Sequence, residues 1–315
     1  MKMLKSIYSD FGPYKGVNGK VGTIGGCFEY TGAPFYAAIS ALKTGADLSH
    51  VFCTASAAIP IKSYTPELIV HPVLKASDEN PELENTQNWN PEQINNLTKW
   101  FPALKTLIIG PGLGRDPYLY EYMMPAVIAE AIAQEKLLVV DADGLNLYCK
   151  QKDVYKGYTR TILTPNEIEF RRLWEAHMEG EAPQNLSSKL DQEIKQLDPQ
   201  DPSVAGVAQL SRALGNVVLK KGTVDIISDG HKTLCVSSEG CPKRSGGLGD
   251  ILTGAVASIA YLAECRNIEI VDAIAQACLL VRLASLKAFR EKGWSLTAPD
   301  VLNLLPSVLL ESLSN

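Results

Sequence analysis

Short apolar runs recur along the first half of the chain, and polar or helical sequence separates each from the next. They occupy residues 20–26, 48–53, 104–109, 137–140 and 161–163. Runs of this length without polar alternation predict strands that are buried on both faces. Small and apolar residues at helical spacing follow the first run, over 33–43, and predict a βα unit at the start of the fold. The alternation indicates an α/β fold with a mainly parallel sheet.

The pattern changes after residue 215. Three apolar runs at 216–220, 224–228 and 232–236 follow one another closely, with Lys221-Gly222 and Asp229-Gly230 between them. Such spacing predicts a short antiparallel meander. Two long helices are expected over 250–265 and 271–290, and a last helix after Pro299. We find no internal repeat and predict a single domain over 1–315.

Two polar stretches, 76–98 and 179–202, interrupt this pattern and are expected to be surface excursions. Within the second stretch, four apolar residues recur at helical spacing: Leu186, Leu190, Ile194 and Leu197. This spacing predicts an amphipathic helix that lies on the body of the protein.

Composition narrows the function. The 30 basic and 35 acidic residues give a net charge of -5, so we expect no broad positive surface for nucleic acid or anionic lipid. The seven cysteines are scattered without a Cys-x-x-Cys pair, which indicates reduced thiols in an intracellular protein. No uncharged apolar run approaches the ~20 residues that span a bilayer. We therefore expect no membrane association and a cytoplasmic location, with a mitochondrial form left open.

The segment 243–250 contains three glycines in four residues and leads directly into a long apolar stretch. Glycines permit a tight turn with exposed N–H groups, and the start of the following helix adds its positive dipole end. The segment therefore predicts a phosphate site. The carboxylate of Asp250 would repel that phosphate unless it removes a proton from an attacking hydroxyl, so we predict that Asp250 is a catalytic base. The alternative is that the glycines only turn the chain and Asp250 caps the helix.

Polar residues also follow the predicted strands, where parallel sheets bind their ligands. Gly110, Gly112 and Gly114 follow the run at 104–109, and Asp141 and Asp143 follow the run at 137–140. After the run at 161–163, Asn166 and Glu169 lie three residues apart. Asp141 and Asp143 are either helix caps or contacts to Mg²⁺ or substrate. For Asn166 and Glu169 the alternatives are a capping box and an approach to hydrated Mg²⁺. The segment 221–225 either reaches a nucleotide or serves only as a hairpin turn.

These motifs occur together, in the order found in one known family. They are Gly25-Gly26 with 30–34, the glycine-rich 110–114, the acidic 141–144, Thr164-Pro165-Asn166 with Glu169-Phe170, Lys221-Gly222, and Gly246-Gly247 with Gly249-Asp250. Over roughly residues 10 to 310 the chain resembles the ADP/ATP-dependent NAD(P)H-hydrate dehydratases, and 45–53 and 66–72 resemble the eukaryotic, ATP-using branch. Ser245 and Leu248 stand where relatives often carry Cys and Gln, so fine contacts around the loop are expected to differ.

The resemblance implies a ribokinase-like three-layer α/β/α fold and the repair of the hydrated cofactors NADHX and NADPHX. The enzyme would phosphorylate the 6-hydroxyl of the (6S)-hydrate with ATP, after which phosphate leaves. It places the hydrate at Gly112, Asn166, Glu167, Ile168, Glu169, Phe170, Arg171, Arg172 and Asp250. It places the nucleotide at Lys221, Gly222, Thr223, Val224, Asp225, Gly240, Cys241, Pro242, Lys243, Arg244, Ser245, Gly246, Gly247, Leu248 and Gly249.

The same resemblance implies that Mg²⁺ arrives with the ATP phosphates, near Asn166 and Glu169, rather than at a dedicated protein site. A separate protein would supply the NAD(P)HX epimerase activity, and homo-oligomerisation is left open. Two other functions fit the residues. A ribokinase-like kinase would stop at the phosphorylated alcohol, and a nucleotide sensor would bind ATP without turnover. A base that faces phosphate argues against the sensor.

Overall fold

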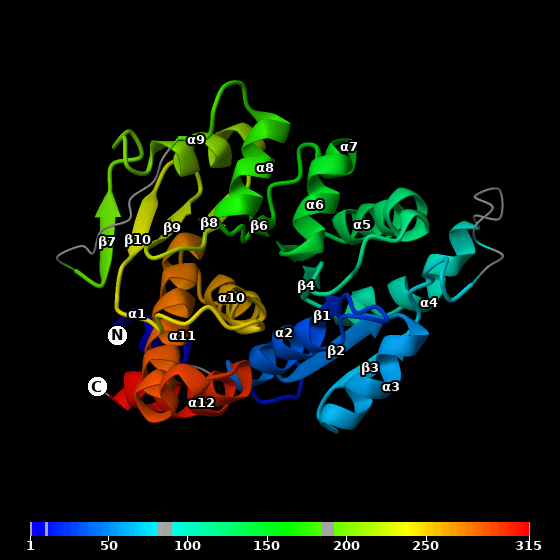
Figure 1. Ribbon diagram of the computed structural model, residues 1–315, viewed down its shortest axis with the longest axis horizontal. Helices are drawn as coiled ribbons and strands as arrows, with labels where there is room; N and C mark the ends of the chain where they lie inside the picture. The colour runs from blue at the N-terminus through cyan, green and yellow to red at the C-terminus, as the bar shows by residue number, and fades with distance from the viewer. Residues whose placement is uncertain (1, 10–11, 81–82, 84–89, 184–191, 315) are drawn as a thin grey trace.

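A single twisted sheet organises the protein in a computed structural model, which describes residues 2–9, 12–80, 83, 90–183 and 192–314 (Figure 1). The ten strands of the described residues have the order β3-β2-β1-β4-β5-β6-β8-β9-β10-β7. Pairing is parallel from β3 to β8 and antiparallel from β8 to β7. The strands are β1 Lys20–Ile24, β2 Leu48–Cys53, β3 Ile69–Pro72, β4 Thr106–Ile109, β5 Leu137–Val140, β6 Thr161–Leu163, β7 Ile194–Leu197, β8 Val217–Lys220, β9 Asp225–Ser228 and β10 Thr233–Val236.

Helices cover both faces of the sheet and bury a separate apolar cluster on each (Figure 1). One layer holds α1 Lys2–Ile7, α2 Gly32–Lys43, α3 Ala55–Tyr64, α10 Leu248–Glu264, α11 Ile270–Lys292 and α12 Ala298–Ser314. The other holds α4 Asn95–Thr98, α5 Met124–Ala133, α6 Asp143–Lys150, α7 Lys152–Tyr155, α8 Glu167–His177 and α9 Ala205–Leu214. Most strand residues are buried, which explains why their sequences read as continuous apolar runs.

The structure confirms the predicted α/β fold, the mainly parallel sheet and the antiparallel extension. Strands β2, β5 and β6 have the predicted bounds, and α10 begins at Leu248, two residues before the expected start. The amphipathic helix is wrong where the structure describes it. Ile194–Leu197 forms the edge strand β7, paired antiparallel with β10, while Leu186 and Leu190 lie outside the described residues. For Ile194 and Leu197, pairing with the edge of β10 outweighs the helical spacing that the sequence shows.

Helix α10 packs unusually close to α2. A β-carbon on Gly254 would lie 2.0 Å from the carbonyl oxygen of Ala37 and 2.0 Å from Oγ of Ser40. Only glycine permits this approach without a shift of backbone. The helix also starts from Gly247, whose φ of 91° is unfavourable for residues with a side chain. These two glycines fix both the depth and the entry angle of the segment that carries Asp250.

A pair of histidines lies on β2 and β3, where sequence spacing gave no sign of a partnership. Nδ1 of His50 and Nε2 of His71 are 3.0 Å apart, and the two rings stack with an interplanar angle of 5°. The ring of Trp100 lies against His71 at 4.6 Å between centroids. Burial is the main cause that lowers the pKa of both imidazoles, to about 4 for His50. The pair therefore favours the neutral form.

No helix among the described residues combines the length and the apolar character that a bilayer crossing requires.

Candidate active site

The loops after β4, β5, β6 and β8 meet at the carboxyl edge of the parallel sheet. Their contact depends on two glycines, because a β-carbon on Gly110 would lie 2.0 Å from the Asp141 carbonyl oxygen and 2.2 Å from the Gly144 nitrogen. Gly110 has a φ of 117°, which side chains disfavour. The glycine-rich run after β4 therefore serves to bring the backbone of the next strand close. The expected crevice of an open α/β sheet lies here.

A cavity of about 550 Å³ opens beside this edge. It is lined by twelve of the residues expected to hold the nucleotide, namely Lys221, Gly222, Thr223, Asp225, Gly240, Cys241, Pro242, Lys243, Arg244, Ser245, Leu248 and Gly249. Asn166 lines it as well. Val224 does not, because its side chain is 4% exposed and packs into the core. Gly246 and Gly247 lie outside the lining and connect it to α10. The size suits a small-molecule ligand.

The first turn of α10 offers free amides at the end of this cavity. Ile251 is the first residue of the turn whose N–H is bonded within the helix, to the Gly247 carbonyl at 3.0 Å. In the described part of the chain, the N–H groups of Leu248 and Gly249 have no acceptor outside the helix. Unbonded amides at a helix start, together with the helix dipole, favour a bound phosphate.

Asp250 occupies the third position of this helix and is partly buried. Burial raises its pKa, the carboxylate of Asp141 raises it further, and the ammonium of Lys221 opposes the rise, so that the pKa is about 7. An acid with this pKa is half ionised near neutral pH and can both accept and return a proton. The sequence predicted the role from the residue's place after the glycines but gave no sign of the shift.

A buried ion pair lies directly beneath this acid. Nζ of Lys221 is 2.7 Å from Oδ1 of Asp141, and both side chains are largely shielded from solvent. Oδ2 of Asp141 accepts a hydrogen bond from Oγ1 of Thr253, one turn after Asp250 on α10. Asp141 is therefore not a helix cap: the cap position of α6 belongs to Ala142. The sequence left Asp141 as either a helix cap or a contact to Mg²⁺ or substrate. It did not predict a role for Thr253.

The start of α8 is held by a complete capping box. Oδ1 of Asn166 accepts hydrogen bonds from the amides of Ile168 and Glu169 at 2.9 and 3.0 Å, and Oε2 of Glu169 accepts one from the Asn166 amide at 2.8 Å. The capping alternative is thus confirmed. It uses the Asn166 oxygen, but the other oxygen of Glu169 has no hydrogen-bond partner among the described residues.

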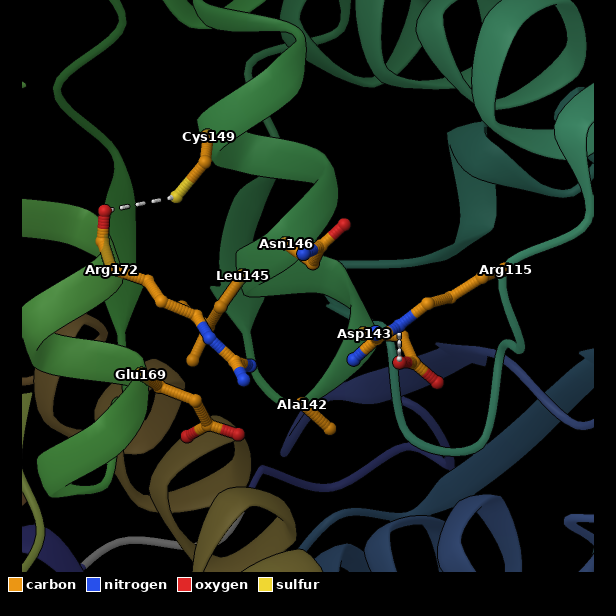
Figure 2. A pocket seen from close by; sticks show the side chains of 8 residues that line it. All are labelled: Arg115, Ala142, Asp143, Leu145, Asn146, Cys149, Glu169 and Arg172. Atoms are coloured by element: carbon orange, nitrogen blue, oxygen red, sulfur yellow. Dashed lines mark hydrogen bonds and ion pairs between the residues drawn. The ribbon is translucent and has the colours of Figure 1, made fainter. Parts of the chain in front are cut away.

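The remaining residues of this segment face different ways. Glu167 pairs with Lys220 and Arg171, and Ile168 is 62% exposed. Phe170 is fully buried, which leaves its side chain in the core rather than in the crevice. Glu169 and Arg172 line a second, smaller pocket beside α6 (Figure 2).

Gly112, which the resemblance places at the hydrate, lines neither of the two pockets described. Its φ is 61°, its carbonyl accepts a hydrogen bond from the Gly26 amide at 2.9 Å, and a β-carbon there would lie 2.8 Å from the Tyr30 carbonyl oxygen. The residue thus links the loops after β1 and β4.

Sequence reasoning missed Arg282, which lies in the apolar middle of α11. Nε of Arg282 is 2.7 Å from Oδ2 of Asp225, and its terminal nitrogens bond the carbonyls of Gly222 and Ser238. One buried guanidinium therefore joins two sides of the larger cavity. The available signal was a charged residue between Val281 and Leu283, in a stretch of α11 that carries no other charge from Ala273 to Leu286.

Comparison with solved structures identifies the class of fold. A ribokinase-like superfamily protein from Enterococcus faecalis superposes with a TM-score of 0.71 at 19% identity, covering 98% of this chain and 94% of that chain. The ADP/ATP-dependent NAD(P)H-hydrate dehydratase from Bacillus subtilis, co-crystallized with ATP and Mg²⁺, has a TM-score of 0.66 at 18% identity, with 96% and 92% covered. The protein therefore has the ribokinase-like fold.

Sequence comparison identifies the family. The family model described as NAD(P)H-hydrate dehydratase matches residues 21–307. The human ATP-dependent (S)-NAD(P)H-hydrate dehydratase is 40% identical over 297 residues, which cover 92% of this chain and 77% of the human protein. The chain belongs to the NAD(P)H-hydrate dehydratase family.

Proposed function

We propose that this protein uses ATP to dehydrate (6S)-NADHX and (6S)-NADPHX to NADH and NADPH, with Asp250 as the base. Membership of the family and 40% identity to an ATP-dependent relative support the reaction. The observation that carries the catalytic assignment is a carboxyl group with a pKa of about 7 in the same helical turn as two free amides. The enzyme is thus a hydro-lyase that consumes a nucleotide.

In the first step, Asp250 accepts the proton of the 6-hydroxyl. The hydroxyl oxygen forms a bond to the γ-phosphorus of ATP, and ADP leaves. The amides of Leu248 and Gly249 donate to the oxygens of the transferring group, where charge develops. In the second step, the bond between C6 and the phosphorylated oxygen breaks, phosphate leaves and C5 loses a proton. The reduced ring is restored.

The larger cavity is the proposed ATP site. Lys221, Gly222, Thr223 and Asp225 line it together with residues 240–245, Leu248 and Gly249. Arg282 links Gly222 and Asp225 to Ser238, which also lines it. Lys243 and Arg244 line the cavity and can meet the triphosphate.

Mg²⁺ is expected to arrive with ATP. Among the described residues, no group of three or more His, Cys, Asp or Glu side chains could hold a metal ion alone. Triphosphate oxygens and waters suit Mg²⁺, and the oxygen of Glu169 that the capping box leaves free is a fitting ligand for its hydrated sphere. Bound in this way, Mg²⁺ supplies positive charge that offsets the triphosphate.

The decisive test is incubation of the purified protein with enzymatically prepared NADHX, Mg²⁺ and either ATP or ADP, followed at the absorbance of NADH. Regained absorbance with release of phosphate supports the dehydratase. A phosphorylated hydrate that accumulates without NADH would instead identify the kinase, and binding without turnover the sensor. Excess chelator should abolish the reaction, and an undiminished rate would count against Mg²⁺.

The proposed reaction also requires a partner enzyme. A separate epimerase is expected to convert the (6R)-hydrate, because the dehydratase acts on the (6S) form. A cytoplasmic location remains a prediction, which fractionation would test, and light scattering would determine the oligomeric state, which the sequence leaves open.

A further inference from the structure

The second pocket lies between the start of α6 and the face of α8. It has a volume of about 110 Å³, several times the ~30 Å³ that one water occupies in the liquid. Ala142, which follows Asp141 directly, forms part of its wall, and so does Glu169. Asn166, one turn before Glu169, lines the ATP cavity instead. The two pockets therefore meet at the start of α8, which contributes one residue to each of them.

Two arginines give this pocket its chemistry. Figure 2 shows the side chains of Arg115 and Arg172 entering from opposite sides, with both head groups directed toward the space above Ala142. Nε of Arg115 is 3.2 Å from Oδ1 of Asp143, which orients the guanidinium and leaves its terminal nitrogens free to donate. The Arg172 guanidinium has no acceptor among the residues that the structure describes. Two planar forks that converge on one space match the oxygens of a phosphate.

The backbone adds to this preference. Ala142 has φ 51° and ψ -123°, an unusual conformation for a residue with a side chain. It caps the start of α6, and no residue in the described ranges accepts a hydrogen bond from its N–H. Asp143 is already satisfied by Arg115 and by the Gly114 amide at 3.1 Å.

We propose that Arg115 and Arg172 form a subsite for a phosphate group of the dinucleotide substrate. The inference rests on the proposed function: when the 6-hydroxyl meets Asp250 with ATP on one side, the rest of the hydrate extends to the other. That phosphate belongs either to the pyrophosphate bridge, which NADHX and NADPHX share, or to the 2′-phosphate, which only NADPHX carries. The two sources predict different substrate preferences.

The experiment measures steady-state kinetics of Arg115→Gln and Arg172→Gln with NADHX and with NADPHX, at saturating Mg²⁺ and ATP. A lost charge-assisted contact should raise the KM for the hydrate at least about tenfold. The kcat and the KM for ATP should change less than about twofold. A rise for both hydrates assigns the pyrophosphate, and a rise for NADPHX alone assigns the 2′-phosphate.

Arg290→Gln is the matched control, since Arg290 is an exposed arginine in the last turn of α11. Arg115→Lys keeps the charge but not the fork, so it should lie between wild type and Arg115→Gln. It also remains informative if Arg115→Gln fails to fold. Unchanged KM values for both hydrates in both glutamine variants would overturn the subsite.

Equilibrium binding separates this inference from the dehydratase reaction itself. Calorimetric titration with the products NADH and NADPH needs no turnover. If the wild-type protein binds a dinucleotide more tightly than the arginine variants do but regenerates no NADH, the proposed reaction fails while the subsite stands. If turnover is normal and the arginine variants bind both products as tightly as wild type, the subsite fails alone.

Discussion

Lys221 and Asp141 form a buried ion pair at 2.7 Å although they follow strands β8 and β5, which are separated by β6 in the sheet. Burial alone would lower the pKa of Lys221, but the carboxylates of Asp141 and Glu169 outweigh it and leave the pKa raised. The lysine is therefore a permanent cation beside Asp250. Its charge opposes the rise that burial and the carboxylates of Asp141 and Glu169 cause in the pKa of Asp250, which is about 7.

Replacement of Asp141 by Asn should change the pH dependence of the reaction. A base must be ionised, so kcat/KM rises with pH through the pKa of Asp250. Asn removes one negative charge and keeps Lys221, which lowers that pKa and moves the acid limb of the profile to lower pH. Thr253→Val, which removes only the hydrogen bond to Asp141, is the control. A limb that stays in place in Asp141→Asn would contradict the electrostatic role.

Replacement of Asp250 itself should separate binding from chemistry. Asp250→Asn keeps the shape of the helix start, so ATP should bind with nearly the wild-type Kd in a calorimetric titration. Turnover should fall at least ~100-fold, as expected when a general base is removed. Full activity of this variant would refute its assignment as the base.

The parallel part of the sheet could be predicted from the sequence, because burial on both faces restricts a strand to apolar residues. Thr161–Leu163 needs only three apolar or β-branched residues to be recognised between two helices. β7 was not readable, because Ile194–Leu197 gains its structure from pairing with β10 and not from its own pattern. Edge strands of this kind depend on a partner that is distant in the sequence.

The candidate site likewise contains residues that the sequence predicted and residues that it did not. Asp250 and the glycines before it could be predicted as a site from the local sequence, because a glycine-rich turn followed by an acid has few purely structural uses. Arg282 acts through Asp225, which is 57 positions away, and no local spacing reveals such a pair. The buried side chains of Phe170 and Val224 show the converse. A residue within a functional segment can serve the core alone.

Arg282→Gln should loosen the ATP site. Removal of one partner from a buried ion pair leaves Asp225 uncompensated and costs about 3–5 kcal/mol of stability. The KM for ATP should rise, because the Gly222 and Ser238 carbonyls lose their shared donor. Urea denaturation and kinetics at varied ATP measure the two effects. The double variant Asp225→Asn with Arg282→Gln should regain part of the stability, and a further loss would argue against the pair.

The stacked histidines predict a loss of stability in acid. The folded state lowers the pKa of His50 to about 4, whereas the unfolded chain binds a proton near its ordinary value of about 6.5. The unfolded state therefore binds more protons below pH 6.5, and the free energy of unfolding falls as the pH drops from there toward 4. His50→Phe should flatten this dependence in denaturation series, while His231→Gln, at an exposed turn, should not. Equal slopes in wild type and His50→Phe would contradict the prediction.

The close approach of α10 to α2 at Gly254 fixes the position of Asp250 relative to the sheet. With no space for even one methyl group between the helices, the acid at the start of α10 cannot retreat or advance to suit a new molecule. Divergence toward other alcohols would have to proceed through the loops at the strand ends, which can lengthen or change composition around an immobile centre. If Asp250 is the base, the fold thus fixes the position of proton transfer, while the loops determine which alcohol is bound.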